Sequence, residues 1–161
     1  MGPLQRLTAA RRRPRWLVAA LAVFTAVFIY TVGETVFPYY TSNHDEAVYL
    51  QQAAMLLEGK LRLFPPVDDV FHPWFFIVDG NSLYPKYTPV TAAIFAVGML
   101  LGSSRIALAI VAAGAVALTY AVVAEVFDRE TGVIAAVLLV LSPLFVVEAS
   151  VFLPYVPAFC L

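Results

Sequence analysis

Two neighbouring carboxylates are the residues best suited to chemistry in this sequence. Asp45 and Glu46 follow Asn43 and stand just ahead of the apolar run AVYLQQAAMLL. A carboxylate there could accept a proton from an attacking hydroxyl or hold a metal ion. Acids are also common in a first helical turn because they cap it, and on this pair alone capping is the favoured interpretation. Tyr49 lies one turn beyond Asp45 on the same helix face, where interfacial tyrosines are also usual.

Lys86 is the second candidate, in the segment Tyr84-Pro85-Lys86-Tyr87-Thr88-Pro89. A lysine held between prolines where the chain re-enters a bilayer could pair with a phosphate at headgroup depth. Ordinary snorkelling of a lysine to the interface is the simpler alternative.

Other ionisable side chains give weaker indications. His44 and His72 could be ligands or proton carriers, but neither has a partner at metal-binding spacing, and a structural role is favoured for His72. We expect Asp68 and Asp69 to be solvated. Glu148 is an acid near the end of an apolar run, a place where acids are costly and often functional.

The composition defines the elements that must position these residues. The chain has 161 residues, of which 61% are hydrophobic and 13% charged, whereas soluble globular chains are about a quarter charged. The sequence therefore predicts an all-α integral membrane protein, a multi-span helical bundle with an outer-face loop that carries amphipathic juxtamembrane helices. The arginine-rich N-terminus adjoins an apolar run. This position favours a role for the arginines in orienting a membrane helix over a role in binding nucleic acid.

The pattern of apolar runs predicts the topology of a cell-membrane protein. An uncleaved anchor is favoured over a signal peptide at the first span, because the apolar run is long and no A-x-A-like site follows. The helix after Pro89 could span or only dip into the outer leaflet. The expected segments are a basic cytoplasmic N-terminus (1–15), a first transmembrane helix (16–37), an extracytoplasmic loop (38–105) with interfacial helices at about 44–58 and 89–102, transmembrane helices at 106–126 and 132–153 joined by a short loop (127–131), and the start of a further segment (154–161).

The order of these features resembles a known family. The segments HDEAVYLQQAAMLLEGKL and LYPKYTPVTAAIFAVGMLLG carry the resemblance, which covers about residues 16 to 160. The chain is similar to the N-terminal part of membrane glycosyltransferases with the GT-C architecture, specifically the family-39-like group of protein O-mannosyltransferases and aminoarabinose transferases. Since members run to several hundred residues, we expect the chain to be a fragment, inactive by itself.

The resemblance implies an enzyme that moves a sugar from a polyprenyl-phosphate carrier to a hydroxyl of a protein, lipid or glycan on the extracytoplasmic side. Asp45 would then orient or deprotonate the acceptor with Glu46 beside it, and Lys86 would bind the donor phosphate. His44, Tyr49 and Tyr87 would line the substrate site. No cofactor is required with certainty, although Asp45 could hold Mg²⁺ or Mn²⁺.

One departure from the family's pattern stands against a two-carboxylate metal site, and a second function stays open. Many relatives carry a second acid where the last of these spans emerges, but here the stretch reads Phe152-Leu153-Pro154-Tyr155, and Glu148 comes about one turn too early. The alternative function is a small non-catalytic membrane protein, such as a transporter subunit or an assembly factor. Transport is disfavoured because the clearest spans contain no ionisable side chain apart from tyrosine.

Overall fold

Two long apolar helices dominate the structure. The computed structural model describes residues 3–39, 43–65, 73 and 75–161, with side chains from residue 16 onward. The helices α1 (Pro3–Thr35) and α4 (Ser104–Val126) each contain a stretch long and apolar enough to cross a membrane, Trp16–Thr35 and Ser104–Val126. Ser103 begins α4, because its side chain accepts a hydrogen bond from the backbone N–H of Arg105 at 3.2 Å.

The prediction of one continuous helix at 132–153 is wrong in one respect, because the helix is interrupted just before Pro143. The helix α5 (Arg129–Leu141) ends there, and α6 (Pro143–Ser150) leaves at 64° to it. Proline has no N–H to continue α5, but it is well suited to the first position of a new helix. Ser142 caps that helix by accepting a hydrogen bond from Phe145 N at 3.4 Å. The two helices are one broken span or a re-entrant pair.

Small residues allow the helices to pack closely. Ala112, Ala115 and Val116 of α4 have no exposed surface and pack against Ile29 of α1 and Ala136 of α5. The short helix α7 (Tyr155–Cys160) joins the same cluster through Val156. Alanine at these positions lets the helix backbones approach closely. Such close van der Waals packing is how helices associate in lipid, where the hydrophobic effect provides no attraction between them.

A second cluster holds the smaller helices against α4. The helices α2 (His44–Leu57) and α3 (Pro89–Leu100) lie where the sequence predicts interfacial helices. Tyr49 of α2, Phe95 of α3 and Leu108 of α4 are buried together with Phe152, which follows α6. This cluster therefore fixes α2 and α3 on the end of α4.

The expected all-α fold is incomplete, because a β-hairpin precedes α3. The strands β1 (Phe76–Asp79) and β2 (Ser82–Pro85) pair antiparallel, with Asp79 opposite Ser82. Gly80 in the two-residue turn has a φ of +58°, the left-handed conformation that such turns require. Leu63 adds a bridge to Leu83 through two backbone hydrogen bonds of 2.8 and 2.9 Å.

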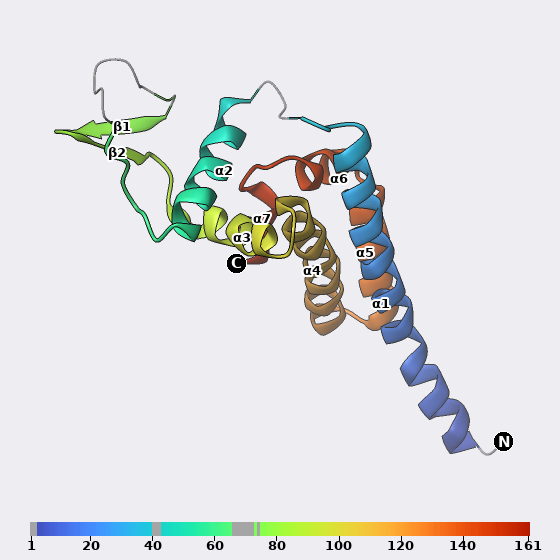
Figure 1. Cartoon of the computed structure of the whole chain (residues 1–161). Coiled ribbons are helices and arrows are strands. Elements are labelled where there is room, and N and C mark those ends of the chain that lie inside the picture. Colours follow the sequence, from blue (N-terminus) through green and yellow to red (C-terminus); the bar gives the residue numbers. More distant parts are fainter. Residues whose placement is uncertain (1–2, 40–42, 66–72, 74) are drawn as a thin grey trace.

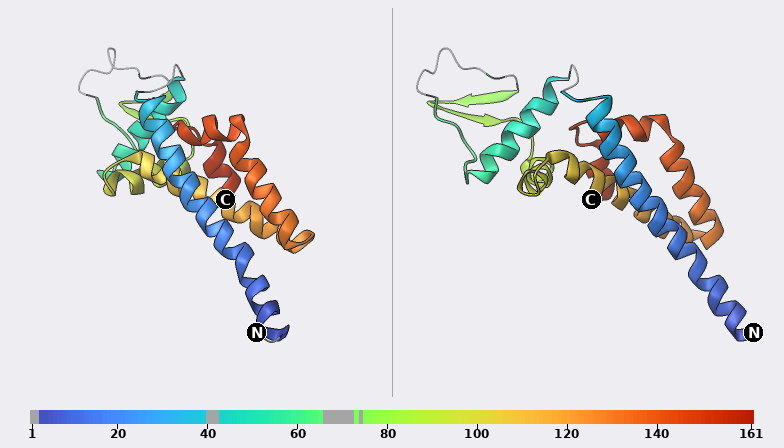
Figure 2. Two further views of the ribbon diagram at one scale, coloured as in Figure 1. Left: turned by 90° about the vertical axis from the view of Figure 1, so that its right-hand side faces the viewer. Right: turned by 45° about the vertical axis from the view of Figure 1, so that its right-hand side comes forward.

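The molecule has two distinct ends. Figure 1 places α2 and the hairpin at one end, together with the part of α1 near Thr35. The N-terminal end of α1 projects alone at the opposite end, and both views in Figure 2 agree. The Asp45 region and the arginine-rich segment therefore lie at opposite ends of the structure.

Candidate functional site

Asp45 lies in the first turn of α2, where the Asn43 side chain accepts a hydrogen bond from its backbone N–H at 3.1 Å. Its side chain is half-buried, and its Oδ1 accepts a hydrogen bond of 2.8 Å from the hydroxyl of Tyr87. These residues are 42 positions apart, so the contact joins the start of α2 to the segment before α3. The carboxylate is thus fixed by both a helix N-terminus and a phenol.

Two tyrosines form the wall of this site. The rings of Tyr49 and Tyr87 stack with centroids 4.9 Å apart, and Phe95 meets Tyr49 edge-on at 6.4 Å. Gln52 holds the backbone of Tyr87, because its Nε2 donates to Tyr87 O at 3.1 Å. The sequence placed Tyr49 one turn after Asp45, and the structure brings Tyr87 to both.

The electrostatics keep both phenols neutral. Burial makes the largest contribution and the hydrogen bond to Asp45 the next largest, and together they raise the pKa of Tyr87 to about 12. Burial also raises the pKa of Tyr49, with smaller contributions from the negative charges of Asp45 and Tyr155. Tyr155 at the start of α7 raises the pKa of both rings, and it was not among the sequence candidates. A phenol of ordinary pKa is already neutral at pH 7, and the raised pKa lets Tyr87 remain a hydrogen-bond donor to still higher pH.

Glu46 faces a different direction from its neighbour. It is 1% exposed, and its Oε2 accepts a hydrogen bond of 2.9 Å from the backbone N–H of Phe152. Successive residues of a helix point about 100° apart, so Asp45 and Glu46 cannot both face one small ligand. Glu46 thus ties α2 to the segment after α6, an arrangement that supports the position of Asp45.

Lys86 lies directly after the hairpin and is exposed. Its Nζ is 5.2 Å from the ring centre of Phe75 and 5.8 Å from that of Tyr87, within the range of cation–π attraction. The backbone N–H of Lys86 donates to Phe75 O at 2.9 Å. Phe75 has a φ of 57°, an uncommon conformation for a residue with a side chain. Tyr87 therefore contacts both Asp45 and Lys86.

The remaining predicted residues are less closely connected to this group. His44 is exposed as the first residue of α2. Glu148 lies on α6, and its Oε2 is buried without a hydrogen-bond partner among the described residues. His72, Asp68 and Asp69 lie outside the described residues.

The described residues around Asp45 do not form a set of ligands for a divalent cation. No group of three or more metal-ligating side chains occurs in the part of the chain that the structure describes. One Asp45 oxygen is engaged by Tyr87, and Glu46 faces Phe152. A cation bound through Asp45 stays a prediction, and no chemical step is derived from it.

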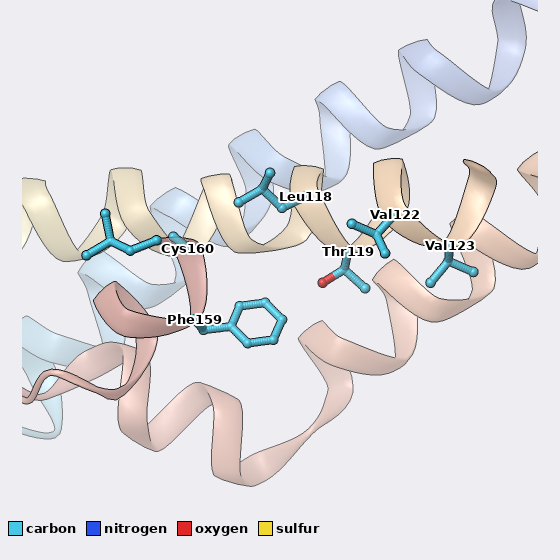
Figure 3. Close-up of a pocket in the computed structure, with 7 residues that line it drawn as sticks. Leu118, Thr119, Val122, Val123, Phe159 and Cys160 are labelled. Carbon is cyan, nitrogen blue, oxygen red and sulfur yellow. The ribbon is translucent and has the colours of Figure 1, made fainter. Parts of the chain in front are cut away.

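A separate apolar groove lies between α4 and α7. It has a volume of about 500 Å³, and its walls come from Leu118, Thr119, Val122, Val123, Phe159, Cys160 and Leu161 (Figure 3). Thr119 Oγ1 is buried there without a hydrogen-bond partner among the described residues. No charged side chain lines this groove, so it offers space for an apolar group rather than a site for chemistry.

Comparison with known proteins adds no assignment. No protein-family model, curated protein or solved structure matches the chain. The glycosyltransferase resemblance therefore rests on the motifs of the sequence alone.

Proposed function

We propose that the chain is the N-terminal, membrane-embedded part of an enzyme that transfers a sugar from a polyprenyl-phosphate donor to an acceptor hydroxyl at the extracytoplasmic face. The observation that carries the proposal is the Asp45–Tyr87–Lys86 group. Its members come from two segments at one end of apolar helices, and they place an anion and a cation in contact with one tyrosine.

Asp45 is the acceptor-side residue of this proposal. As the new bond forms between the acceptor oxygen and the sugar C1, the hydroxyl proton passes to the Asp45 carboxylate. The hydrogen bond from Tyr87 fixes the orientation of that carboxylate, with one oxygen engaged and the other left for the acceptor. The stacked Tyr49 ring restricts Tyr87 in turn.

Lys86 is the donor-side residue. The bond from the sugar C1 to the carrier phosphate oxygen breaks, and the electron pair leaves with the phosphate. An exposed ammonium beside two aromatic rings can approach that phosphate and stabilise the charge that develops on it. An interfacial position suits this reaction because the carrier's tail stays in lipid while its phosphate meets a water-soluble acceptor.

The multi-span arrangement is part of the proposal. The stretches Trp16–Thr35 and Ser104–Val126 supply two candidate crossings, and the bent pair α5 and α6 supplies a third. The arginine-rich N-terminus favours a cytoplasmic start under the positive-inside rule. The end of the molecule that carries α2 and the hairpin would then face outward.

The test measures sugar transfer in membranes that contain the full-length gene product. Asp45→Asn should lower transfer by about 10²- to 10⁴-fold, the usual contribution of a general base. Lys86→Met should lower it by about 10²- to 10³-fold, as for loss of one group that stabilises a developing anion. Glu58→Gln is the control, because Glu58 is exposed at the end of α2 and, among the described residues, forms an ion pair only with Lys60 at the surface.

Equal membrane insertion of all variants must accompany these losses. Near-normal transfer by Asp45→Asn would contradict the assignment of Asp45. Such a result in both site variants would favour the non-catalytic alternative.

A further inference from the structure

Phe152 is a buried residue between α6 and α7 that contacts three other helices. Its backbone N–H donates to the buried Glu46 carboxylate of α2 at 2.9 Å. Its ring meets the Phe95 ring of α3 edge-on, with centroids 5.7 Å apart and planes at 82° to each other. The Arg105 guanidinium of α4 lies over the same ring, 5.0 Å from its centre. One residue that the proposed reaction does not use therefore joins α2, α3 and α4.

Arg105 fixes the position of that ring. Its side chain is 8% exposed, and its Nε lies 3.0 Å from Oε1 of Glu34 at the end of α1. Its Nη2 donates to the backbone oxygen of Phe37, just beyond α1. These two contacts orient the guanidinium, and a cation shielded from water is attracted to a ring face more strongly than an exposed one. The end of α1 is thereby connected through Arg105 to Phe152.

Phe95 continues this series of contacts to the candidate site. It is completely buried, and its ring lies edge-on to that of Tyr49 with centroids 6.4 Å apart. Tyr49 stacks on Tyr87 at 4.9 Å, and the Tyr87 hydroxyl donates to Asp45. Rings in direct contact within a close-packed cluster do not shift independently, because each fills the space that its neighbours leave. A displacement of the Phe152 ring is therefore transmitted toward the Tyr87 hydroxyl.

We propose that Phe152 is a positioning residue for the candidate site, whose ring holds the Tyr87–Asp45 hydrogen bond in the observed geometry. Arg105 is a second positioning residue, which acts by holding that ring. The consequence for catalysis rests on the proposed function, whereas the geometry itself can be measured without sugar transfer.

The test observes the Tyr87 hydroxyl directly. The full-length protein is prepared with tyrosine that is isotope-labelled at the ring carbon Cζ, reconstituted in nanodiscs and studied by NMR spectroscopy at neutral pH. The Cζ signal responds to hydrogen bonding of the attached hydroxyl. Tyr87→Phe identifies the Tyr87 signal by its absence, and Asp45→Ala gives the position of that signal when the acceptor is removed.

Two methionine substitutions provide a matched pair. Phe152→Met removes the ring, retains the backbone N–H and fills much of the same volume with a flexible side chain. It should move the Tyr87 signal most of the way to its position in Asp45→Ala. Phe145→Met makes the same change in α6, at a residue that is 8% exposed where Phe152 is 7% exposed, but in the cluster formed with α1, α4 and α5. It should leave the Tyr87 signal unchanged.

Arg105→Met tests the second residue with the ring in place. It should move the Tyr87 signal in the same direction as Phe152→Met, and it should have no further effect when added to that variant. In sugar transfer by the full-length enzyme, Phe152→Met should lower kcat by about 10- to 10²-fold and leave the KM for the donor unchanged. Misplaced reacting groups slow the chemical step without weakening the binding of the carrier.

An unchanged Tyr87 signal in Phe152→Met would overturn the proposal. An equal displacement in Phe145→Met would do so too, because it would show a general effect of packing. If Phe152→Met fails to fold, an unchanged signal in Arg105→Met overturns the proposal instead. Since the signal is measured without substrate, a protein that shows the expected displacements but transfers no sugar would contradict only the proposed reaction.

Discussion

Gly33 of α1 is a position where a single added methyl group should disturb a buried charge. A Cβ built on Gly33 lies 2.7 Å from Arg105 Nη1 and 3.5 Å from Ser150 O. The first distance is 0.7 Å shorter than the 3.4 Å at which ordinary van der Waals contact begins. In Gly33→Ala, the Arg105 guanidinium must therefore move.

That movement is costly because the guanidinium is held on several sides. Arg105 bonds Glu34 and the Phe37 carbonyl and lies over Phe152. Loss of one such charged hydrogen bond costs about 1.5–3 kcal/mol. Alanine recovers about 1 kcal/mol of helix propensity over glycine. The net loss of unfolding free energy in Gly33→Ala should be about 0.5–2 kcal/mol.

Gly114→Ala is the matched control. Gly114 lies inside α4, and a Cβ there meets nothing within 4 Å. The same propensity gain of about 1 kcal/mol should appear without a clash. Equilibrium unfolding in mixed micelles, followed by circular dichroism, should separate the two variants by about 1.5–3 kcal/mol.

A double-mutant cycle tests the cause of this difference. In an Arg105→Met background the clashing nitrogen is absent, so Gly33→Ala should stabilise the protein about as much as Gly114→Ala does. Equal stabilities of the two single variants, or an unchanged cost in the methionine background, would refute the reasoning.

Three further predictions concern the site, the bend and the topology. Tyr87→Phe should remove the highest transition from the ultraviolet titration of tyrosine ionisation, because the pKa of Tyr87 is raised from 10.0 to about 12. The contribution of the neutral phenol to stability is complete below pH 10 and is lost as the pH rises through 12, so the stability of the variant should depend less on pH in that window. Pro143→Ala should reduce the 64° bend, and spin labels at the far ends of α5 and α6 should separate toward the ~32 Å of a straight helix; an unchanged distance would mean that packing holds the bend. With the native cysteine replaced, a cysteine at Asp79 should be labelled from outside and one at Arg129 from inside, and outside labelling at Arg129 would show that α3 crosses fully.

Local signals in the sequence were sufficient for the start of α2. Asn43 followed by acids in the first turn is a capping pattern. It predicted the start of the helix, the place of Asp45 in its first turn and the position of Tyr49 on the same face. These features depend on residues within one or two turns, where side-chain geometry follows from spacing alone.

Long-range contacts were beyond the sequence. The Tyr87–Asp45 hydrogen bond spans 42 positions, and nothing in the spacing of the two residues specifies it. The burial of Arg105 was also missed, because a lone arginine before an apolar run is typical of a membrane boundary. From the sequence, the hairpin was placed only within the loop 38–105, since its strands of four residues are too short for a clear alternating pattern.

The bond between Glu46 and Phe152 also has a consequence for the order of events during synthesis. The two residues are separated by 106 positions, and a ribosome adding about 5–20 residues per second needs roughly 5–20 s to cover that interval. During this time α2 has been made, but the backbone N–H of Phe152 that donates to its buried carboxylate does not yet exist. This hydrogen bond, and with it the final position of α2, can therefore form only after α4, α5 and α6 have been synthesised. The geometry around Asp45 is thus among the last parts of the chain to mature.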